Sequence, residues 1–438
     1  MKKELINFPY LTKPISLYTL DNGHKVALAH KEGALVNISS WVKTGSINED
    51  DVNNGVSHFL EHLMFKGTER FKAGDFDRIM EQKGGIINAA TWKDYTFYYI
   101  TISKNHLDLA LDMHSDMMTN ITLPEEEIGP AFDIAGVAPE EKRERYVVLE
   151  EIKMRKDQNW SKVYHALNDM MYEKHPYKRD VIGTSEIISQ IPRSAIMDYY
   201  NSFYTPENIS TIVAGDFDEE HVLQEIIKGF KFRNTKTKIM PHGEMELEIK
   251  NPRTEVQRGD VNCGYIMFGF LADSAKNLKE SIALDIISTV LGEGKSSRLY
   301  VNLIEKMAEP YYYSLDTCHY QFKEGNNFFI EANFDHTKFD KVIPEIKNEL
   351  KNIQNITEDE LKKAKKQTKV GFASSTETVA KLGDSIGHYL TVCEDLNVAQ
   401  NYEKLLEEID IQYIQDVAKK YLDPEKCAIN VLLPNEEK

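Results

Sequence analysis

Three residues whose side chains suit a metal site lie close together in the segment GVSHFLEHLMFKGTERF, which runs from Gly55 to Phe71. If residues 55–66 form a helix, His58 and His62 are four positions apart and share one face. Two imidazoles placed in this way can bind one zinc ion. Glu61 lies beside them and can reach a water molecule on the metal without binding the metal itself, as a general base must.

The alternative is that these histidines are ordinary residues of a packed helix. The neighbouring side chains argue against this, because most of them are apolar: Phe59, Leu60, Leu63, Met64 and Phe65. A carboxylate among such residues is costly to bury without a partner. The segment therefore favours a metal site over a purely structural helix.

A catalytic zinc site needs a third protein ligand and leaves its fourth position to water. The segment EKRERYVVLEEIKMRKDQ, residues 141–158, is predicted to form a helix with Val147, Val148 and Ile152 on its apolar side. Glu144 and Glu151 are two turns apart and share a face. An acidic helix of this kind is often only a solvated surface, so its pairing with the histidine helix is what makes it a candidate.

These two helices belong to a chain that looks duplicated. FYYITISKNHLDLALDMHSDMMTNITLPEEEI, from Phe97, matches FFIEANFDHTKFDKVIPEIKNELKNIQNITEDEL, from Phe328, as a strand, an amphipathic helix and an Ile-Thr turn. A helix, turn and buried strand from Gln190 likewise match a segment from Glu408. The sequence predicts an α+β fold with two homologous halves, each a mostly antiparallel or mixed sheet packed on one side by helices.

We place the first half at residues 1–232, a charged linker at 233–254 and the second half at 255–438. The first half carries the candidate metal site. In the second, the segment corresponding to the histidine helix has Ala283, Ile286 and Ile287 where the first half has His58, Glu61 and His62. The second half is therefore expected to bind no metal and to serve substrate clamping and dimerisation.

Composition narrows the possible partners. The 438 residues carry a net charge of −17, which disfavours binding to nucleic acid. The sequence shows neither an apolar run long enough to cross a bilayer nor the apolar core of a signal peptide. These features predict a cytoplasmic protein that associates with neither nucleic acid nor membrane.

The chain also resembles the pitrilysin/insulinase family of zinc metallopeptidases, the inverzincins, which carry an H-x-x-E-H motif. It looks most similar to short members such as mitochondrial processing peptidase. The segments that carry the resemblance span the chain: YTLDNGHKVAL, GVSHFLEHLMFKGTERF, GGIINAATWKDYTFYYI, ERYVVLEEIKMR, SFYTPENISTIVAGDF and GEGKSSRLYVNLIEK. The resemblance implies one Zn²⁺ per chain held by His58, His62 and Glu151, with Glu61 as general base and Glu144 as a supporting catalytic residue.

The resemblance further implies how substrate binds. An extended peptide would pair with an edge strand made by Asn88, Ala89, Ala90 and Thr91. In the second half Arg298 and a tyrosine would contact substrate; Tyr313 is the preferred match, and Tyr311 and Tyr312 stay open. The implied activity is endopeptidase cleavage of peptides or unfolded segments in a closed chamber, with Glu61 activating a zinc-bound water.

One chain supplies only half of such a chamber, so the resemblance implies a homodimer or, as the second choice, a heterodimer with an inactive homologue. The alternative function is a non-catalytic or partner-dependent subunit of a heterodimeric peptidase. The sequence departs from the family pattern at residues 129–141, where GPAFDIAGVAPEE lengthens the connection to the glutamate helix. The sequence leaves open whether this insertion gates the chamber, contacts a partner or does neither; our hypothesis is that it lines the chamber entrance.

Overall fold

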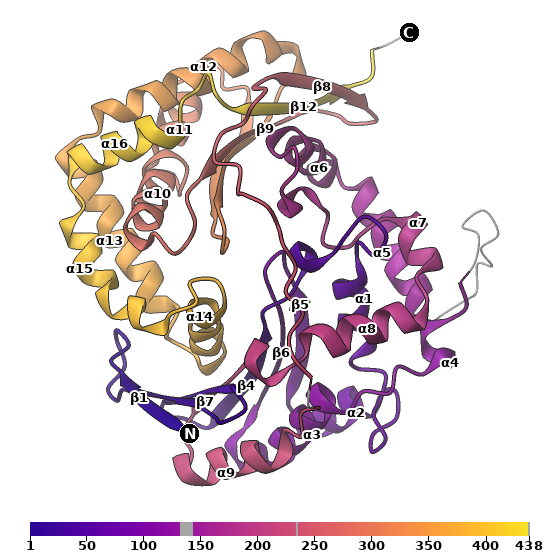
Figure 1. Ribbon diagram of the computed structural model, residues 1–438. Coiled ribbons are helices and arrows are strands. Elements are labelled where there is room, and N and C mark those ends of the chain that lie inside the picture. Colours follow the sequence, from indigo (N-terminus) through magenta and orange to yellow (C-terminus); the bar gives the residue numbers. More distant parts are fainter. Residues whose placement is uncertain (132–142, 234, 437–438) are drawn as a thin grey trace. The chain divides into compact units, whose positions relative to one another are not determined.

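The computed structural model describes residues 1–131, 143–233 and 235–436 (Figure 1). It contains two compact units. The first comprises residues 1–153, 179–242 and 373–400, and the second comprises 154–178, 243–372 and 401–438. The predicted halves, which end at residue 232 and begin again at 255, were drawn from the repeat in the sequence. The compact units differ from them, because the first unit also contains residues 373–400 of the second half and the second unit contains residues 154–178 of the first half. The predicted insertion at residues 129–141 lies, from residue 132 onward, outside the described residues.

The first unit is built on a seven-stranded mixed sheet with the order β1-β2-β3-β7-β4-β6-β5. Only β3 and β7 pair in parallel, and the other neighbours are antiparallel. The strands are β1 (Lys2–Ile6), β2 (Ile15–Thr19), β3 (Lys25–His30), β4 (Leu35–Val42), β5 (Ile86–Thr91), β6 (Thr96–Ser103) and β7 (Ile209–Gly215). The strand β5 therefore forms one edge of the sheet.

Helices of the N-terminal half cover one face of this sheet. On β4, Val36, Ile38 and Val42 alternate toward these helices and join the main apolar core. The helices of this half that lie wholly or mostly in the first unit are α1 (Val56–Leu63), α2 (Asp75–Gln82), α3 (Leu107–Thr119), α4 (Glu125–Ile128), α5 (Glu144–Asp157), α7 (Ser185–Gln190), α8 (Arg193–Phe203) and α9 (Glu219–Gly229). The predicted α+β class is confirmed.

The opposite face of the same sheet carries one helix from the second half, α14 (Val379–Thr391), which packs on β4 and β7 (Figure 1). Two glycines one turn apart make this close approach possible. A Cβ at Gly383 would overlap the Asn37 side chain, and one at Gly387 would overlap the Trp41 ring. This helix differs from the prediction, in which helices pack on one side of each sheet only.

The second unit has a five-stranded sheet with the order β10-β11-β9-β12-β8, in which only β8 and β12 are parallel. Its strands are β8 (Thr254–Gly259), β9 (Gly264–Ala272), β10 (Tyr312–Tyr320), β11 (Asn326–Phe334) and β12 (Ala428–Pro434). Its helices are α6 (Asn159–Met171), which packs on β9 and β12, and α10 (Leu278–Leu291), α11 (Arg298–Tyr300), α12 (Phe339–Asn352), α13 (Glu358–Ser374), α15 (Tyr402–Glu408) and α16 (Ile411–Tyr421).

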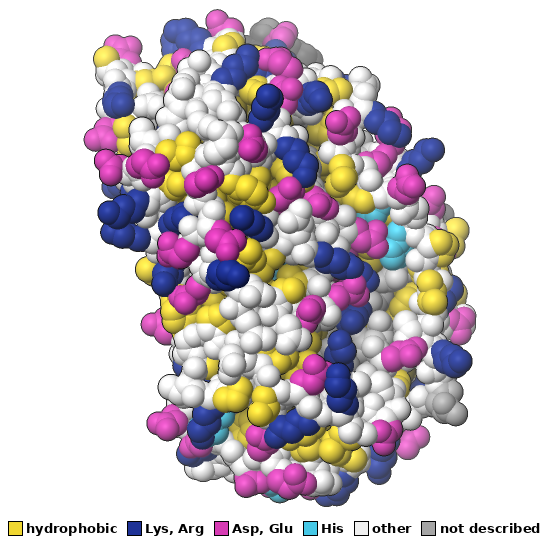
Figure 2. All heavy atoms as spheres, turned by 60° about the vertical axis from the view of Figure 1, so that its left-hand side comes forward, with side chains coloured by type: hydrophobic (Ala, Val, Ile, Leu, Met, Phe, Trp, Pro, Cys, Tyr) yellow, Lys and Arg dark blue, Asp and Glu magenta, His cyan; other side chains and the backbone are white. Residues whose placement is uncertain are grey.

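Within the described residues, every helix is too short or too polar to cross a bilayer. Figure 2 shows one face of the molecule, on which acidic and basic side chains are interspersed. The net charge of −17 is therefore not gathered into one acidic patch on this face.

Candidate metal centre

The helix α1 presents the H-x-x-E-H residues from an apolar base. It begins after Gly55, whose φ of 95° is a left-handed conformation that glycine adopts without strain. Val56, Phe59, Leu60 and Leu63 are fully buried in the core. The remaining edge of the helix therefore carries His58, Glu61 and His62, and the predicted helix is confirmed over residues 56–63.

The helix α5 brings the acidic residues to the same place. Val148, Leu149 and Ile152 are its buried apolar residues, and Glu144 and Glu151 are turned toward α1. Val147 was predicted on the apolar side but is 42% exposed, and Leu149 is buried instead. The two glutamates share a face as the spacing predicted.

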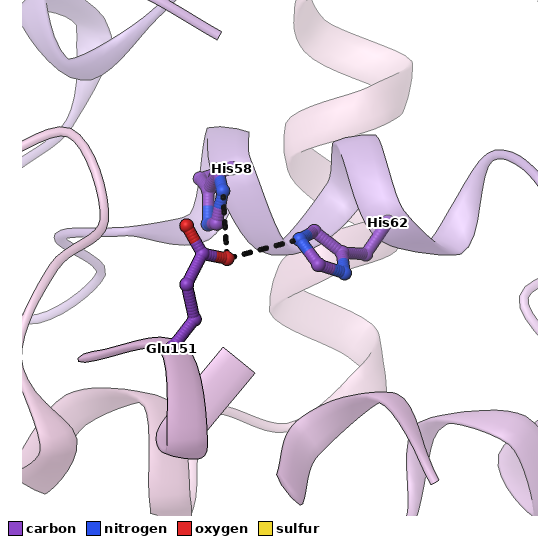
Figure 3. A group of neighbouring side chains, drawn as sticks. All are labelled: His58, His62 and Glu151. Carbon is purple, nitrogen blue, oxygen red and sulfur yellow. Dashed lines mark ion pairs between the residues drawn. The ribbon is translucent and has the colours of Figure 1, made fainter. Parts of the chain in front are cut away.

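His58, His62 and Glu151 come together at the centre of the site (Figure 3). One ligand atom from each lies within 4.8 Å of the others. Glu151 Oε2 is 3.6 Å from His58 Nε2 and 3.5 Å from His62 Nε2. Donors around a tetrahedral zinc with bonds of about 2.0–2.1 Å are roughly 3.4 Å apart, so these two spacings are close to those of a zinc site.

Glu144 lies behind His62 and not among this trio. Its Oε2 is 3.0 Å from His62 Nδ1, which leaves Nε2 directed toward Glu151. Its other oxygen, Oε1, is 2.6 Å from Lys66 Nζ. Burial pushes the pKa of Glu144 upward, but the hydrogen bonds from His62 and Lys66 outweigh burial and hold it below its ordinary value.

The same carboxylates act on His62. Burial alone would lower the pKa of His62, but the hydrogen bonds to Glu144 and Glu151 raise it to about 9. A site that attracts a proton so strongly also attracts a metal cation, and the cation must displace that proton to bind the ring nitrogen.

Glu61 is connected to the edge of the sheet. Its Oε2 accepts a hydrogen bond from Thr91 Oγ1 at 2.5 Å. Burial raises the pKa of Glu61, and the Thr91 hydrogen bond and the His62 charge partly oppose that rise. Thr91 was predicted only as part of the substrate-binding strand, so its contact with Glu61 is an addition.

Arg145 is a buried cation that the sequence analysis missed. It is 1% exposed, and its Nη1 donates to Ile188 O and its Nη2 to Ile191 O at 2.8 Å, both at the C-terminal end of α7. The guanidinium also lies 5.4 Å from the centre of the Phe59 ring on α1. Burial lowers the pKa of Arg145 to about 10. Arg145 thus joins α5, α7 and α1, and no sequence spacing signals this.

The predicted substrate strand coincides with β5. Asn88 and Ala90 are exposed, Ala89 is half-buried and Thr91 is buried. β5 pairs with β6 on one side only, so its other side offers free backbone groups at the sheet edge. The prediction that residues 88–91 form an edge strand is confirmed, while substrate binding there stays a prediction.

The predicted substrate contacts of the second unit are placed differently. Arg298 forms an ion pair with Glu360 at 2.7 Å and donates to the carbonyls of Asn352 and Asn355. Tyr311 and Tyr312 both donate to Glu345. Tyr313 is 65% exposed on the edge strand β10. Substrate contact by Arg298 and Tyr313 stays a prediction.

The segment of the second half that corresponds to the metal helix forms the helix α10. Ala283, Ile286 and Ile287 all lie on α10 and are fully buried. Three apolar side chains packed in the core offer no metal ligand. Among the described residues, the only group of three or more side chains placed to bind a metal is His58, His62 and Glu151.

Comparison with known proteins identifies the family. Residues 25–185 match the model of the insulinase family, peptidase family M16, and residues 190–368 match that of the peptidase M16 inactive domain. The zinc protease PqqE of Helicobacter pylori is 30% identical over 97% of this chain and 94% of its own length. An uncharacterized zinc protease of Bacillus subtilis is 28% identical over 83% of this chain and 85% of its own.

More distant relatives include a probable mitochondrial-processing peptidase subunit beta of Arabidopsis thaliana, 24% identical over 96% of this chain and 78% of that protein. Among solved structures, a protease from Helicobacter pylori superimposes with a TM-score of 0.86 at 28% identity, covering 97% of this chain and all of that one. Together with the two sheets and the duplicated halves, these matches show that the chain belongs to the insulinase family of zinc peptidases, peptidase family M16.

Proposed function

We propose that this protein is a zinc-dependent endopeptidase that cleaves peptides or unfolded polypeptide segments. The observation that supports this most is the convergence of His58, His62 and Glu151 within 4.8 Å, beside a half-buried carboxylate, Glu61, that is not one of the three. The zinc protease relatives provide independent support.

The donor set fits zinc. Two imidazoles and one carboxylate form a common catalytic zinc set, and such sites leave a fourth position open. The carboxylate of Glu144 fixes the orientation of the His62 ring through Nδ1, as acceptors behind metal-binding histidines commonly do. We therefore assign His58, His62 and Glu151 as the ligands of one zinc ion per chain.

When bound, zinc supplies a Lewis acid that lowers the pKa of water and polarises the scissile carbonyl. The protein groups around it then manage the protons. Glu61 takes a proton from the attacking water and later delivers it to the leaving amine. Because burial raises the pKa of Glu61, its carboxylate is a stronger base than an exposed glutamate. The Thr91 hydroxyl fixes the direction of that carboxylate.

Substrate is held as an added strand on β5. Backbone groups of residues 88–91 pair with the peptide. Thr91, the last residue of the strand, holds the Glu61 carboxylate beside the end of β5. Recognition through the backbone tolerates many sequences, so we expect broad cleavage limited mainly by whether the polypeptide is unfolded.

The test is zinc content together with hydrolysis of a quenched fluorescent peptide library, for the wild type, Glu61→Gln and Glu150→Gln. Glu150 is 68% exposed on α5 and provides the matched control. We expect about one zinc per chain in all three proteins, cleavage by the wild type and the control, and loss of at least about a hundredfold in kcat for Glu61→Gln. Wild-type turnover in Glu61→Gln would refute the assignment.

We further propose that the active form is a homodimer, because one chain carries both the metal-binding residues and the predicted clamping residues Arg298 and Tyr313. A heterodimer with an inactive homologue is the second choice. We also propose that the protein is cytoplasmic. Light scattering on the purified protein tests the first proposal. A monomer that binds zinc but cleaves nothing would favour the partner-dependent alternative.

A further inference from the structure

The loop that precedes the metal helix contains a buried carboxylate with an unusual set of partners. Glu49 is 3% exposed. Its Oε2 accepts hydrogen bonds from the Gly55 backbone N–H and the Asn54 side chain, both at 2.7 Å. Its Oε1 accepts from the Ser57 backbone N–H at 2.9 Å and from the Ser57 hydroxyl. All of these donors come from residues 54–57, at the start of α1.

This geometry makes Glu49 the acceptor for two backbone N–H groups at the start of the metal helix, those of the N-cap residue Gly55 and of Ser57, while the Val56 N–H donates to Asn53 O. Those groups have no partner within the helix, and they carry the positive end of its dipole. Burial raises the pKa of Glu49, and the hydrogen bonds from Ser57, Gly55 and Asn54 work against that rise. The direction in which α1 enters the core is thus set by a side chain from a loop six residues upstream.

The same loop, residues 44–49, also holds the turn that follows the edge strand. The N–H of Ile47 donates to Lys93 O at 2.9 Å, and the N–H of Ser46 donates to Trp92 O at 3.4 Å. Gly45 lies against this turn so closely that a Cβ would overlap the carbonyl oxygen of Trp92. The loop therefore forms hydrogen bonds both with the start of α1 and with the turn that connects β5 to β6.

The hydroxyl of Tyr199, on α8, fixes the base of the loop. It lies 2.6 Å from Thr44 Oγ1 and donates to Gly45 O at 3.2 Å. Thr96, the first residue of β6, donates from its hydroxyl to Thr44 O at 3.0 Å. The loop is thus fixed at residues 44 and 45, while its later residues bond to the β5–β6 turn and to the start of α1. These contacts leave α1 and the turn little freedom to move separately.

The contacts close a ring. Glu49 holds α1, α1 carries Glu61, Glu61 accepts from Thr91, and Thr91 directly precedes the turn that the loop holds. Substrate added to β5 must present its scissile bond to Glu61, so the spacing between α1 and β5 is the quantity that this ring fixes.

We propose that Glu49 is a positioning residue that couples the metal helix α1 to the substrate strand β5 through the 44–49 loop. The catalytic part of this inference rests on the proposed function, whereas the mechanical coupling does not. Glu49→Gln leaves the backbone N–H of either Gly55 or Ser57 without an acceptor, because a carboxamide presents only one oxygen. Both α1 and the hairpin turn then loosen.

The test compares the wild type, Glu49→Gln and Asp51→Asn. Asp51 lies in the same segment, and its side chain is 94% exposed, so it controls for the loss of one negative charge. Hydrogen exchange of the metal-free proteins reports on the coupling. We expect Glu49→Gln, but not Asp51→Asn, to accelerate exchange in residues 55–63 and also in residues 92–95.

The second readout is the zinc dissociation constant, measured by competition with a chelator. Loss of a group that hydrogen-bonds directly to a metal ligand weakens metal binding by about 10–100-fold. Glu49 acts on the ligands one step further away, through the start of α1, so we expect the zinc dissociation constant of Glu49→Gln to increase by about tenfold, the lower end of that range. Faster exchange restricted to residues 55–63, or a zinc dissociation constant within twofold of the Asp51→Asn value, would overturn the proposal.

If Glu49→Gln does not fold, Glu49→Asp replaces it under the same criteria, because it keeps the charge and shortens the side chain by one methylene. Failure of the wild type to bind zinc would refute the proposed function instead. The exchange comparison would then still decide whether the loop couples α1 to β5.

Discussion

Two buried histidines make the first unit sensitive to acid. They lie at the ends of a hydrogen-bonded chain through the core: His114 Nε2 to Ser40 Oγ at 2.8 Å, Ser40 Oγ to Thr211 Oγ1 at 2.9 Å, and Thr211 Oγ1 to His24 Nε2 at 2.9 Å. Both rings are fully buried, and burial lowers the pKa of each to about 3. Both are therefore neutral in the folded protein at any pH at which it is commonly studied.

The sign and size of the effect follow from proton linkage. An unfolded histidine binds a proton below a pH of about 6.5, while these folded histidines do not until a pH of about 3. Between these values the unfolded state binds more protons, so the free energy of unfolding falls as the pH falls. Each histidine contributes about 1.4 kcal/mol per pH unit. At pH 5 the loss is about 2 kcal/mol for each and about 4 kcal/mol for both.

The assay is urea unfolding of the chelator-treated protein at pH 7 and pH 5, followed by tryptophan fluorescence. Trp41 and Trp92, two of the three tryptophans, belong to the first unit. We compare the wild type with His114→Gln and with His106→Gln, which changes a partly exposed histidine of the same unit. The pH-dependent loss should be smaller by about 2 kcal/mol in His114→Gln and unchanged in His106→Gln. An equal loss in all three proteins would refute the reasoning.

Three further predictions concern the site and its supports. Glu144→Gln removes the charged acceptor from His62 Nδ1, so it should weaken zinc binding by about 10–100-fold in chelator competition, whereas Glu150→Gln should bind zinc like the wild type. Equal zinc affinities of Glu144→Gln and Glu150→Gln would contradict the supporting role of Glu144. Arg145→Met leaves buried carbonyls of α7 without donors and should lower the free energy of unfolding by about 2–4 kcal/mol, whereas a change below about 0.5 kcal/mol would contradict the account. Gly387→Ala places a methyl group where the Trp41 ring lies, so we expect the free energy of unfolding to fall by about 1–3 kcal/mol and the tryptophan fluorescence to change. Gly371→Ala adds a methyl group in open space and should leave the fluorescence unchanged.

Short-range patterns in the sequence predicted the central part of the site. The i to i+4 spacing of His58 and His62 on an apolar helix predicted one shared face, and the seven-residue spacing of Glu144 and Glu151 predicted another. Lys66 could have been found by the same reasoning, because it lies four residues after His62 and contacts the carboxylate that orients it. In each case the geometry is set within one helix, where periodicity is reliable.

Contacts between distant segments could not be predicted in this way. Arg298 forms its ion pair with Glu360, which is 62 residues later in the sequence, and this pair depends on how α11, α12 and α13 pack. The position of α14 on the first sheet depends on close packing at Gly383 and Gly387, and a pair of glycines four residues apart does not name its partner. Nothing in the sequence distinguishes Glu49 from other acidic loop residues, because its contacts with the N–H groups of Gly55 and Ser57 depend on how the loop packs against the start of α1.

The central claim is that one zinc ion is held by His58, His62 and Glu151. A crystal of the zinc-loaded protein, with anomalous data collected on both sides of the zinc absorption edge, tests it directly. We predict one strong anomalous peak per chain, about 2.0–2.2 Å from a ring nitrogen of each histidine and from a Glu151 oxygen. A peak held by other residues, or no peak between these three side chains, would contradict the account.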